Sequence, residues 1–223
     1  MRTTTLTALC AVLALSATQA QAADGKATTS NGPFYVGVEA GVVVPEDVNF
    51  QGSGSNYSIN GKFKFDDGYS VSALAGYKFN DYLRAEAQLG YNSFDYKSIS
   101  GSATVNGTSY AGSVSMNGDV ESWTGMLRGV VAPFGKQTIT PLIGAGIGFA
   151  ATSEKVSRIA NQSVNLSDDH TDLALEGMLG FEANVSPQWA VGGRYRYSWV
   201  NSGTSYTDDF TAHSFSATAS YHF

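Results

Sequence analysis

The sequence predicts an all-β fold, an eight-stranded antiparallel up-and-down transmembrane β-barrel, from three observations. Residues 213–223 alternate strictly between apolar and polar side chains and finish on the aromatic Phe223. Successive residues of a strand face opposite sides of a sheet, so this segment has one apolar and one polar face. The same alternation recurs about seven more times upstream, and the links between these segments are alternately long and short.

The predicted barrel strands are the eight segments that carry this alternation. They span residues 34–44, 68–79, 82–94, 119–132, 139–150, 171–185, 189–199 and 213–223. In the third segment, for example, Leu83 and Ala85 lie on one side while Arg84 and Glu86 lie on the other. A tilted strand of about a dozen residues is long enough to cross the apolar band of an outer membrane, which is about 25 Å tall.

The links between strands indicate how such a barrel is oriented. Short links lie at 80–81, 133–138 and 186–188, and long polar links lie at roughly 45–67, 95–118, 151–170 and 200–212. Bacterial outer-membrane barrels have short periplasmic turns and longer extracellular loops. We therefore expect a protein of the bacterial outer membrane with extracellular loops and with both termini in the periplasm.

Two of the long links carry more specific expectations. Residues 51–62 match no chemical motif and predict a mobile, solvated loop. Residues 98–118 are rich in Ser, Gly, Val and Asn, and they either extend the barrel strands as a β-ribbon or form a solvated hairpin. A protruding ribbon offers edges and side chains to partners.

The alternative to a membrane barrel is a soluble up-and-down barrel of the lipocalin type, in which the apolar face points inward. Two features favour the membrane barrel. The charges on the polar faces are mostly arginine and glutamate in near balance, and aromatic residues gather near the strand ends. Girdles of aromatic residues are typical of the two membrane interfaces.

The polar strand faces therefore predict a charge network in the lumen. Its members are Glu39, Lys78, Arg84, Glu86, Arg128, Glu176, Glu182, Arg194 and Arg196. The lumen of an eight-stranded barrel is just wide enough for side chains to fill, and breaking a buried ion pair costs about 3–5 kcal/mol. Arginine binds carboxylates bidentately. The network either fills the lumen as a structural element or, if the pairs can exchange, acts as a gate for water and small ions.

The domain organisation is predicted from the N-terminus. Arg2, an apolar run over residues 6–17 and the small-x-small pattern of residues 20–22 predict a signal peptide over 1–22, a short segment over 23–33 and the barrel over 34–223. Cys10 is the only cysteine, so the exported chain has no disulfide scaffold.

Loss of Arg2 leaves 12 basic against 19 acidic residues. An acidic chain without basic clusters is a poor nucleic-acid binder, so no nucleic-acid partner is expected.

Enzymatic chemistry has little support in the sequence. The run of acidic residues and His170 over 168–172 suggests a metal site or a general base, but it is also typical of a polar loop end. His213 and Ser214 are adjacent on a strand and point to opposite faces, so they do not readily share a proton. Phosphate loops, zinc-ligand spacings and nucleophile elbows are absent. We therefore predict no catalytic residue, no metal and no cofactor.

Several segments resemble a known family. These are FYVGVEAG (34–41), GYKFNDYLRAEAQLGYNSF (76–94), GRYRYSW (193–199) and the terminal Tyr-His-Phe. Together they are similar to the small outer-membrane β-barrel superfamily that includes the OmpA membrane domain, OmpX and the opacity-type surface antigens. The resemblance implies insertion by the outer-membrane assembly machinery, with the aromatic residues Tyr221 and Phe223 as the assembly signal. It also implies roles in envelope integrity, surface adhesion or host interaction.

Three functions follow as hypotheses. The first is a structural protein of the envelope whose surface loops bind an extracellular protein or host ligand, with outer-membrane lipid and lipopolysaccharide as further partners. The second is a narrow porin, because Gly144, Gly146 and Gly148 leave space on one strand. The third, a lipid-modifying enzyme, rests only on the acidic run at 168–172 and on His213.

Overall fold

The computed structural model describes residues 32–135, 137–159, 162–201 and 208–223. These residues form ten β-strands: β1 (Phe34–Pro45), β2 (Val48–Gly54), β3 (Tyr57–Phe65), β4 (Gly68–Lys78), β5 (Leu83–Val105), β6 (Thr108–Val131), β7 (Ile139–Ile159), β8 (Gln162–Asn184), β9 (Trp189–Val200) and β10 (Phe210–His222). Within the described ranges, no helix is long and apolar enough to span a membrane. The predicted signal peptide at 1–22 and nearly all of the segment at 23–33 lie outside the described residues.

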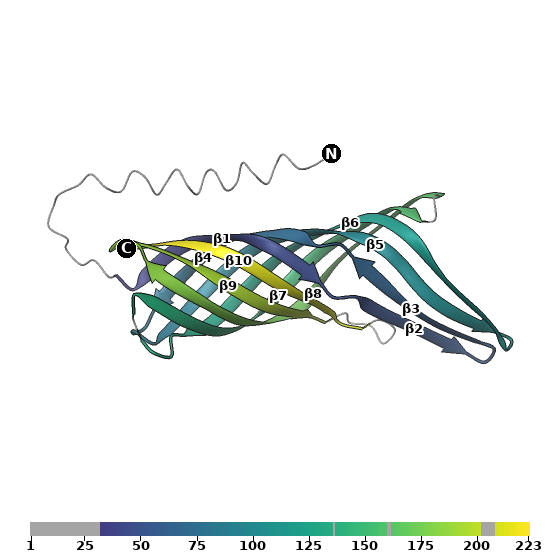
Figure 1. Ribbon diagram of the computed structural model, residues 1–223, viewed down its shortest axis with the longest axis horizontal. Helices are drawn as coiled ribbons and strands as arrows, with labels where there is room; N and C mark the ends of the chain where they lie inside the picture. Colours follow the sequence, from purple (N-terminus) through teal and green to yellow (C-terminus); the bar gives the residue numbers. More distant parts are fainter. Residues whose placement is uncertain (1–31, 136, 160–161, 202–207) are drawn as a thin grey trace.

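Eight of the strands close into a ring, which confirms the predicted fold class. The hydrogen-bonded order is β1-β4-β5-β6-β7-β8-β9-β10, and β10 pairs back with β1, with every neighbour antiparallel. The strands run obliquely around the barrel (Figure 1). The first and last strands are joined over their whole length, from Tyr35 opposite His222 to Pro45 opposite Ala212. Closure removes the unpaired edges that an open sheet would expose.

The short links are tight turns fixed by side-chain hydrogen bonds. Asn80 Oδ1 accepts hydrogen bonds from the backbone N–H groups of Tyr82 and Leu83, both at 2.8 Å. Ser186 Oγ accepts one from the backbone N–H of Trp189 at 3.0 Å. Asn and Ser side chains favour turns because they replace backbone hydrogen bonds locally. These turns lie at the same end of the barrel as the C-terminus (Figure 1).

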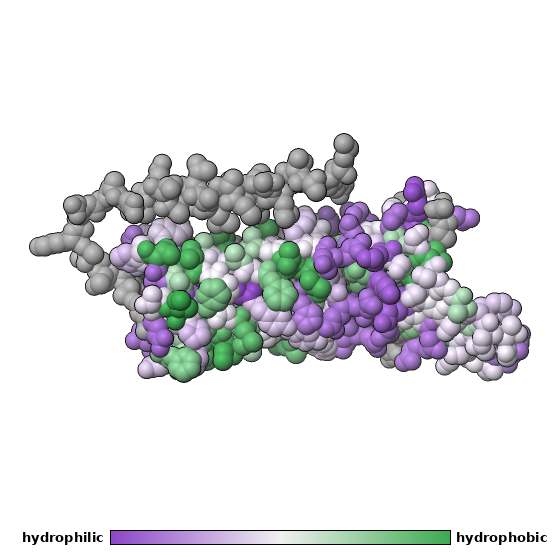
Figure 2. All heavy atoms as spheres, viewed as in Figure 1, coloured by the Kyte–Doolittle hydropathy of each residue, from purple (hydrophilic) through white to green (hydrophobic). Residues whose placement is uncertain are grey.

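The alternation places apolar side chains on the outside of the ring and polar side chains inside it. Leu127 is 68% exposed, whereas its neighbour Arg128 is 2% exposed. Apolar residues gather over the half of the barrel near the C-terminus, and hydrophilic residues gather toward the other end (Figure 2). This distribution excludes the lipocalin-type alternative, in which the apolar face points inward.

Aromatic side chains form two groups along the outer face. Near the C-terminus, the ring centroids of Phe34 and Tyr77 are 4.9 Å apart, and those of Trp189 and Tyr221 are 5.3 Å apart. Farther along the barrel, the ring centroids of Tyr91 and Trp123 are 5.1 Å apart. Aromatic belts of this kind mark the two interfaces of a membrane. We refer to the group with Tyr91 and Trp123 as the far girdle.

Beyond the far girdle the sheet continues as a projecting β-extension, formed by β2, β3 and the outer parts of β5 and β6 (Figure 1). The expectation of a mobile loop at 51–62 is wrong, because these residues form the β2–β3 hairpin. The hairpin is held because β3 pairs with β5 from Tyr57 opposite Val105 to Phe65 opposite Tyr96. Residues 98–118 form the β-ribbon that the sequence allowed. The link at 151–170 is also mostly β-structure, as outer parts of β7 and β8.

β-Bulges mark the level at which the barrel becomes the extension. Opposite Lys64 and Phe65 of β3, strand β5 has the extra residue Lys97. Opposite Asn117 and Gly118 of β6, strand β7 has the extra residue Ser157. The β5–β6 register also shifts between Asp95 and Ser98. A bulge re-aims the side chains beyond it and increases the local twist. The tip of the β5–β6 ribbon is an Asn106-Gly107 turn with φ values of 49° and 80°. Both central residues of a type I′ turn need positive φ, which Asn and Gly adopt most readily.

Candidate functional site

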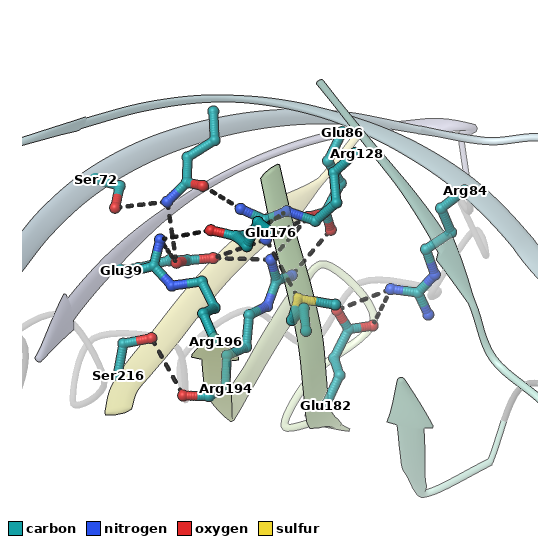
Figure 3. Close-up of polar contacts among 12 residues, drawn as sticks. Glu39, Ser72, Arg84, Glu86, Arg128, Glu176, Glu182, Arg194, Arg196 and Ser216 are labelled. Carbon is teal, nitrogen blue, oxygen red and sulfur yellow. Dashed lines mark hydrogen bonds and ion pairs between the residues drawn. The ribbon is translucent and has the colours of Figure 1, made fainter. Parts of the chain in front are cut away.

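The lumen holds a cluster of six charged side chains, three glutamates and three arginines, which we call the lumen plug. Its members are Glu39 on β1, Glu86 on β5, Arg128 on β6, Glu176 on β8, and Arg194 and Arg196 on β9. Their side chains are at most 6% exposed. Figure 3 shows these side chains reaching toward one another from different strands.

Glu86 is the most heavily bonded member of the plug. Its Oε2 accepts hydrogen bonds from Arg194 Nη1 at 2.7 Å and from Arg128 Nη1 at 3.2 Å. Its Oε1 accepts from Arg194 Nη2 at 2.9 Å and from the Tyr35 hydroxyl at 2.7 Å. Arg194 therefore grips this carboxylate with both terminal nitrogens, the geometry that makes arginine–carboxylate pairs strong.

The remaining contacts close the cluster across the lumen. Glu39 Oε1 accepts from Arg194 Nη1 at 2.8 Å, and Arg196 Nη1 lies 3.7 Å from both Glu39 Oε2 and Glu176 Oε2. Arg128 Nε lies 3.1 Å from Glu176 Oε1. Each charge therefore has a partner of opposite sign, and the plug as a whole is neutral. Neutrality matters because an unpaired charge in a desolvated site costs several kcal/mol.

In two places a glycine lies on the strand between two residues that contact each other across it. Gly76 lies between Tyr35 and Glu86 in the register, and a Cβ atom there would overlap the Tyr35 ring. Gly146 lies between Arg128 and Glu176, and a Cβ atom there would meet Arg128 Cγ at 3.5 Å. At Gly76 the missing side chain makes room for a contact between strands that are not neighbours, whereas at Gly146 a Cβ atom would meet Arg128 only in ordinary van der Waals contact.

The remaining members of the predicted network lie outside this cluster. Arg84 Nη1 and Glu182 form a separate buried pair, with distances of 3.1 and 3.0 Å to the two carboxylate oxygens. Lys78 is half-buried, and its Nζ lies 5.5 Å from the centroid of the Tyr35 ring. The structure thus brings six of the nine predicted residues together, places two in a second pair and leaves Lys78 beside an aromatic ring.

Three neutral residues, Tyr35, Ser72 and Gln88, also belong to the network, although the pattern of charged residues in the sequence does not include them. Gln88 donates a hydrogen bond to Ser72 Oγ at 2.7 Å and also accepts one from Arg128 Nη2. The three residues share the inward parity of Glu39 on β1, Lys78 on β4 and Arg84 on β5, respectively, so the same alternation identifies them. Their side chains are neutral, so the balance of arginine and glutamate that predicts the network does not mark them.

Two of the glycines that suggested a porin are closely packed. A Cβ atom at Gly148 would overlap the backbone oxygen of Gly125 and lie 2.7 Å from Met126 Sδ. At Gly144 it would lie 3.0 Å from Met178 Cε. Neighbouring backbone and side chains already occupy the space that these glycines provide.

On the far-girdle side of the plug, the lumen widens into a cavity of about 450 Å³, which we call the vestibule. Aromatic side chains of β3, β5 and β10 line one part of it: Phe63, Phe65, Phe94, Tyr96 and Phe210. Glu154 of β7 and Asp168, His170 and Asp172 of β8 line another part. The phenyl rings of Phe94 and Phe210 are stacked, with centroids 5.5 Å apart. The vestibule therefore has an apolar aromatic side and an acidic side.

Tyr96 lies where these two sides meet. Its hydroxyl donates a hydrogen bond to Glu154 Oε2 at 2.6 Å. Burial raises the pKa of the Tyr96 hydroxyl above its ordinary value, and the negative charges of Glu154 and Asp168 raise it further. The field in this part of the vestibule therefore disfavours another negative charge.

The acidic run at 168–172 does not act as one group. Asp168, His170 and Asp172 line the vestibule, whereas Asp169 has the opposite parity on β8 and does not line it. Asp168, Asp169 and His170 are all exposed, and Asp172 is half-buried. His170 Nε2 lies 3.4 Å from Asp172 Oδ2. Within the described ranges, no three His, Cys, Asp or Glu side chains are grouped closely enough to hold a metal ion.

His213 and Ser214 point to opposite faces, as the strand alternation requires. Ser214 is buried in the lumen, whereas His213 contacts the outer-face residue Tyr195, with Nδ1 2.8 Å from its hydroxyl. His213 Nε2 lies 2.8 Å from Glu46 Oε1, and Thr211 Oγ1 donates to Glu46 Oε2 at 2.6 Å. The hydrogen bonds from Thr211 and then His213 lower the pKa of the Glu46 carboxyl.

The aromatic residues at the C-terminus lie on the outer face of β10. Phe223 is 53% exposed, and its ring centroid is 5.3 Å from that of Tyr221. The Phe223 backbone N–H donates to Phe34 O at 3.1 Å, which fixes the end of the chain to the start of β1.

Comparisons with known proteins agree with this architecture. Residues 8–223 match a family described as the outer membrane protein beta-barrel domain. Among solved structures, Neisserial surface protein A is 18% identical over 86% of this chain and 98% of its own, with a TM-score of 0.50. OprG from Pseudomonas aeruginosa is 13% identical over 87% of this chain and 98% of its own, also with a TM-score of 0.50. At these identities the likeness supports the fold alone. No curated protein matches the chain in sequence.

Proposed function

The chain belongs to the outer membrane protein β-barrel family of bacteria, and we propose that it is a non-conducting barrel whose β-extension binds partners outside the cell. The protein is placed in the bacterial outer membrane by its family. The extension lies at the end of the barrel opposite the C-terminus, and the short turns lie at the C-terminal end (Figure 1). Short turns are periplasmic in such barrels, so we assign the extension to the cell surface and both termini to the periplasm.

The observation that carries this proposal is the lumen plug. Six charged side chains from β1, β5, β6, β8 and β9 meet inside the barrel, and the side chains of Glu39, Glu86 and Arg128 are fully buried. The Arg84–Glu182 pair adds a second buried contact. A solute would have to break several charge-assisted hydrogen bonds to pass. These features support a structural lumen over a gate or a narrow porin.

The β-extension supports the binding role. Its four strands β2, β3, β5 and β6 offer an ordered surface, and among the described strands β2 pairs only with β3. Near its start, Asn49 O accepts a backbone hydrogen bond from Asp208, and beyond this point the other edge of β2 has no strand partner within the described ranges. Partners commonly add a strand to such an edge. Tyr57 and Tyr110 are 48% and 64% exposed there, and aromatic side chains are frequent anchors of interfaces. We propose an extracellular protein or host ligand as the partner.

The membrane contributes further partners. The apolar outer face and its two aromatic girdles fit outer-membrane lipid and lipopolysaccharide. The half-buried Tyr221 near the end of β10 and the exposed Phe223 that follows β10 form an aromatic pair that is available to the assembly machinery. We propose no enzymatic activity, because the acidic run at 168–172 is divided between two faces and His213 faces away from Ser214.

Conductance tests the closed lumen. We expect the purified protein in planar bilayers to give no discrete current steps, and vesicles containing it to exclude small sugars. The matched variant is Arg128→Ala with Arg194→Ala, which removes two of the three cations of the plug. Discrete steps in the unsubstituted protein would contradict the proposal.

Truncation tests the binding role. One variant replaces residues 52–59, the outer part of the β2–β3 hairpin, with a two-residue turn, which keeps Gln51 opposite Asn60. A second shortens the β5–β6 ribbon by removing residues 101–112. Bacteria displaying the full chain should adhere to cultured epithelial cells or to surfaces coated with fibronectin or collagen. Both truncated barrels should fold and lose that adhesion, whereas a change in the periplasmic turn at 186–188 should not. Equal adhesion of truncated and full barrels would refute the role.

A further inference from the structure

The vestibule is built differently from the plug beside it. At its inner end lies Ser214, whose register partner on β9 is the plug residue Arg196. From there the cavity extends toward the β-extension and reaches Phe63 and Phe65 on β3. A volume of about 450 Å³ falls within the range of small-molecule sites, about 300–1,000 Å³.

The carboxylates of the vestibule have fewer basic partners than those of the plug. Among the described lining residues the basic side chain is His170, whose Nε2 lies 3.4 Å from Asp172 Oδ2. Four carboxylates line it, namely Glu154, Asp168, Asp172 and Asp208, and among the described residues no lysine or arginine does. Glu154 and Asp168 lie directly opposite each other on β7 and β8. Like charges in this position repel each other. A cation between them would relieve the repulsion.

The aromatic side of the vestibule supplies the other half of a recognition site. Phe65 makes edge-on contacts with Phe94 and Phe210, with ring centroids 5.6 and 6.0 Å apart, and its ring lies 5.0 Å from that of Tyr96. These rings come from β3, β5 and β10, which are far apart in the sequence. Such a surface favours a flat or extended apolar group, and aromatic faces also attract cations.

We propose that the vestibule binds a small organic cation, an ammonium or guanidinium group that carries an aromatic or alkyl body. The cationic head would lie at Glu154, Asp168 and Asp172, and the body would lie against Phe65, Phe94 and Phe210. This inference goes beyond the proposed binding role of the β-extension and does not depend on it. The plug closes the inner end, so the ligand would be held at the cell-surface side of the barrel.

The test uses the full barrel in nanodiscs of phosphatidylcholine, with empty nanodiscs subtracted to remove partition into lipid. Four probes are titrated by calorimetry or saturation-transfer NMR: phenethylammonium, phenethyl alcohol, phenylpropionate and butylammonium. The first has both features of the ligand, the second lacks the charge, the third reverses it and the fourth lacks the ring. We expect phenethylammonium to bind saturably and each of the other three to bind at least tenfold more weakly.

Two matched variants locate the site. Asp168→Asn removes one charge from the lining of the vestibule at constant size. Asp169→Asn makes the same change at the next residue, which is equally classed as exposed but has the opposite parity on β8 and does not line the vestibule. We expect the first to weaken phenethylammonium binding about tenfold and the second to leave it unchanged. Retention of compact mobility in unheated SDS gels checks that both variants are folded.

Three results would overturn the proposal. They are equal binding of phenethyl alcohol and phenethylammonium, equal effects of the two Asn variants, and no saturable binding of any probe to the unsubstituted barrel. The probe series needs no variant, so the proposal stays testable even if Asp168→Asn fails to fold.

Discussion

Replacement of Glu86 by Gln tests most directly whether the lumen plug is desolvated and closed. The substitution keeps the shape of the side chain and removes its charge, so the plug changes from three glutamates and three arginines to a net charge of +1. The NH₂ group of the new glutamine is itself a hydrogen-bond donor, and every position it can take in the plug faces another donor. If its NH₂ replaces Oε2, it meets Arg128 Nη1 and Arg194 Nη1, which now donate to that position at 3.2 and 2.7 Å.

The other orientation of the amide is less costly but still leaves a conflict. If the NH₂ replaces Oε1, the Tyr35 hydroxyl can turn and accept a hydrogen bond, but Arg194 Nη2 then faces a donor. One charge-assisted hydrogen bond is lost, at about 1.5–3 kcal/mol, and one guanidinium loses its countercharge. Removal of one partner of a buried pair costs about 3–5 kcal/mol in total, so we expect that loss in the free energy of unfolding.

The assay is urea unfolding of the barrel in lipid vesicles, followed by tryptophan fluorescence. Glu121→Gln is the control, because Glu121 lies on the outer face of β6 and accepts a single hydrogen bond from Tyr91 at 3.0 Å. It should lose no more than about 1.5 kcal/mol. The double variant Glu86→Gln with Arg194→Met restores neutrality and should recover more than half of the loss. A loss below about 1 kcal/mol for Glu86→Gln would indicate a hydrated lumen and refute this reasoning.

Two further predictions concern single positions. Gly76→Ala should displace the Tyr35 ring from the plug. We expect the free energy of unfolding to fall by about 2–4 kcal/mol, because one charged hydrogen bond is lost and the site is overpacked. Gly177→Ala is the control and should cost almost nothing in the same unfolding assay, because a Cβ atom at Gly177 meets no neighbour within 4 Å. The hydrogen bond from Thr211 is the main cause of the lowered pKa of the Glu46 carboxyl in the folded protein. The ionised carboxylate therefore stabilises the fold fully above the unfolded-state pKa, near 4.5, and this stabilisation is lost as the pH falls through the folded-state pKa. The protection of the Glu46 N–H against hydrogen exchange, relative to its intrinsic rate at each pH, should therefore fall below that pH, because this group donates to Thr211 O. Glu46→Gln should abolish that pH dependence of protection.

The barrel could be predicted from the sequence because its signal is local. Each strand carries its own alternation, and the membrane fixes which face is apolar. The inward positions of Arg84 and Glu86 follow from that parity alone. The hairpin of β2 and β3 could not be predicted in this way, because residues 51–62 are mostly small and polar and gain their order from pairing with β5, about 40 residues away.

Asn-Gly dipeptides show the same limit of prediction from local sequence. Asn106-Gly107 forms the tip of the β5–β6 ribbon, with positive φ at both residues. Asn60-Gly61 and Asn117-Gly118 carry the same two residues but lie inside β3 and β6. A dipeptide signals a turn only where the partner strands allow one, and that pairing is a property of the whole sheet.

The pairing within the plug depends on the stagger of the strands around the ring. Glu86 lies opposite Arg128 on the neighbouring strand, which a hairpin register could predict. Its bidentate contact with Arg194 crosses the lumen between strands 108 residues apart, and that contact is set by the closed geometry of the barrel. Parity therefore predicts which residues face the lumen, whereas closure decides which of them meet.

The carboxylates of the plug and those of the vestibule differ in how many basic side chains lie beside them. We expect this difference to give them different roles, fold stability for the plug and ligand binding for the vestibule. Glu86 in the plug lies within 3.2 Å of two guanidinium groups, whereas among the described residues no lysine or arginine lines the vestibule around Asp168. The Glu86 carboxylate stabilises the fold because arginines neutralise its charge. The Asp168 carboxylate contributes to a negative electrostatic potential that attracts a cation. Glu86→Gln should therefore lower the unfolding free energy while the remaining folded barrel binds phenethylammonium normally. Asp168→Asn should weaken binding with little loss of stability, because removal of one of two opposed like charges relieves a repulsion.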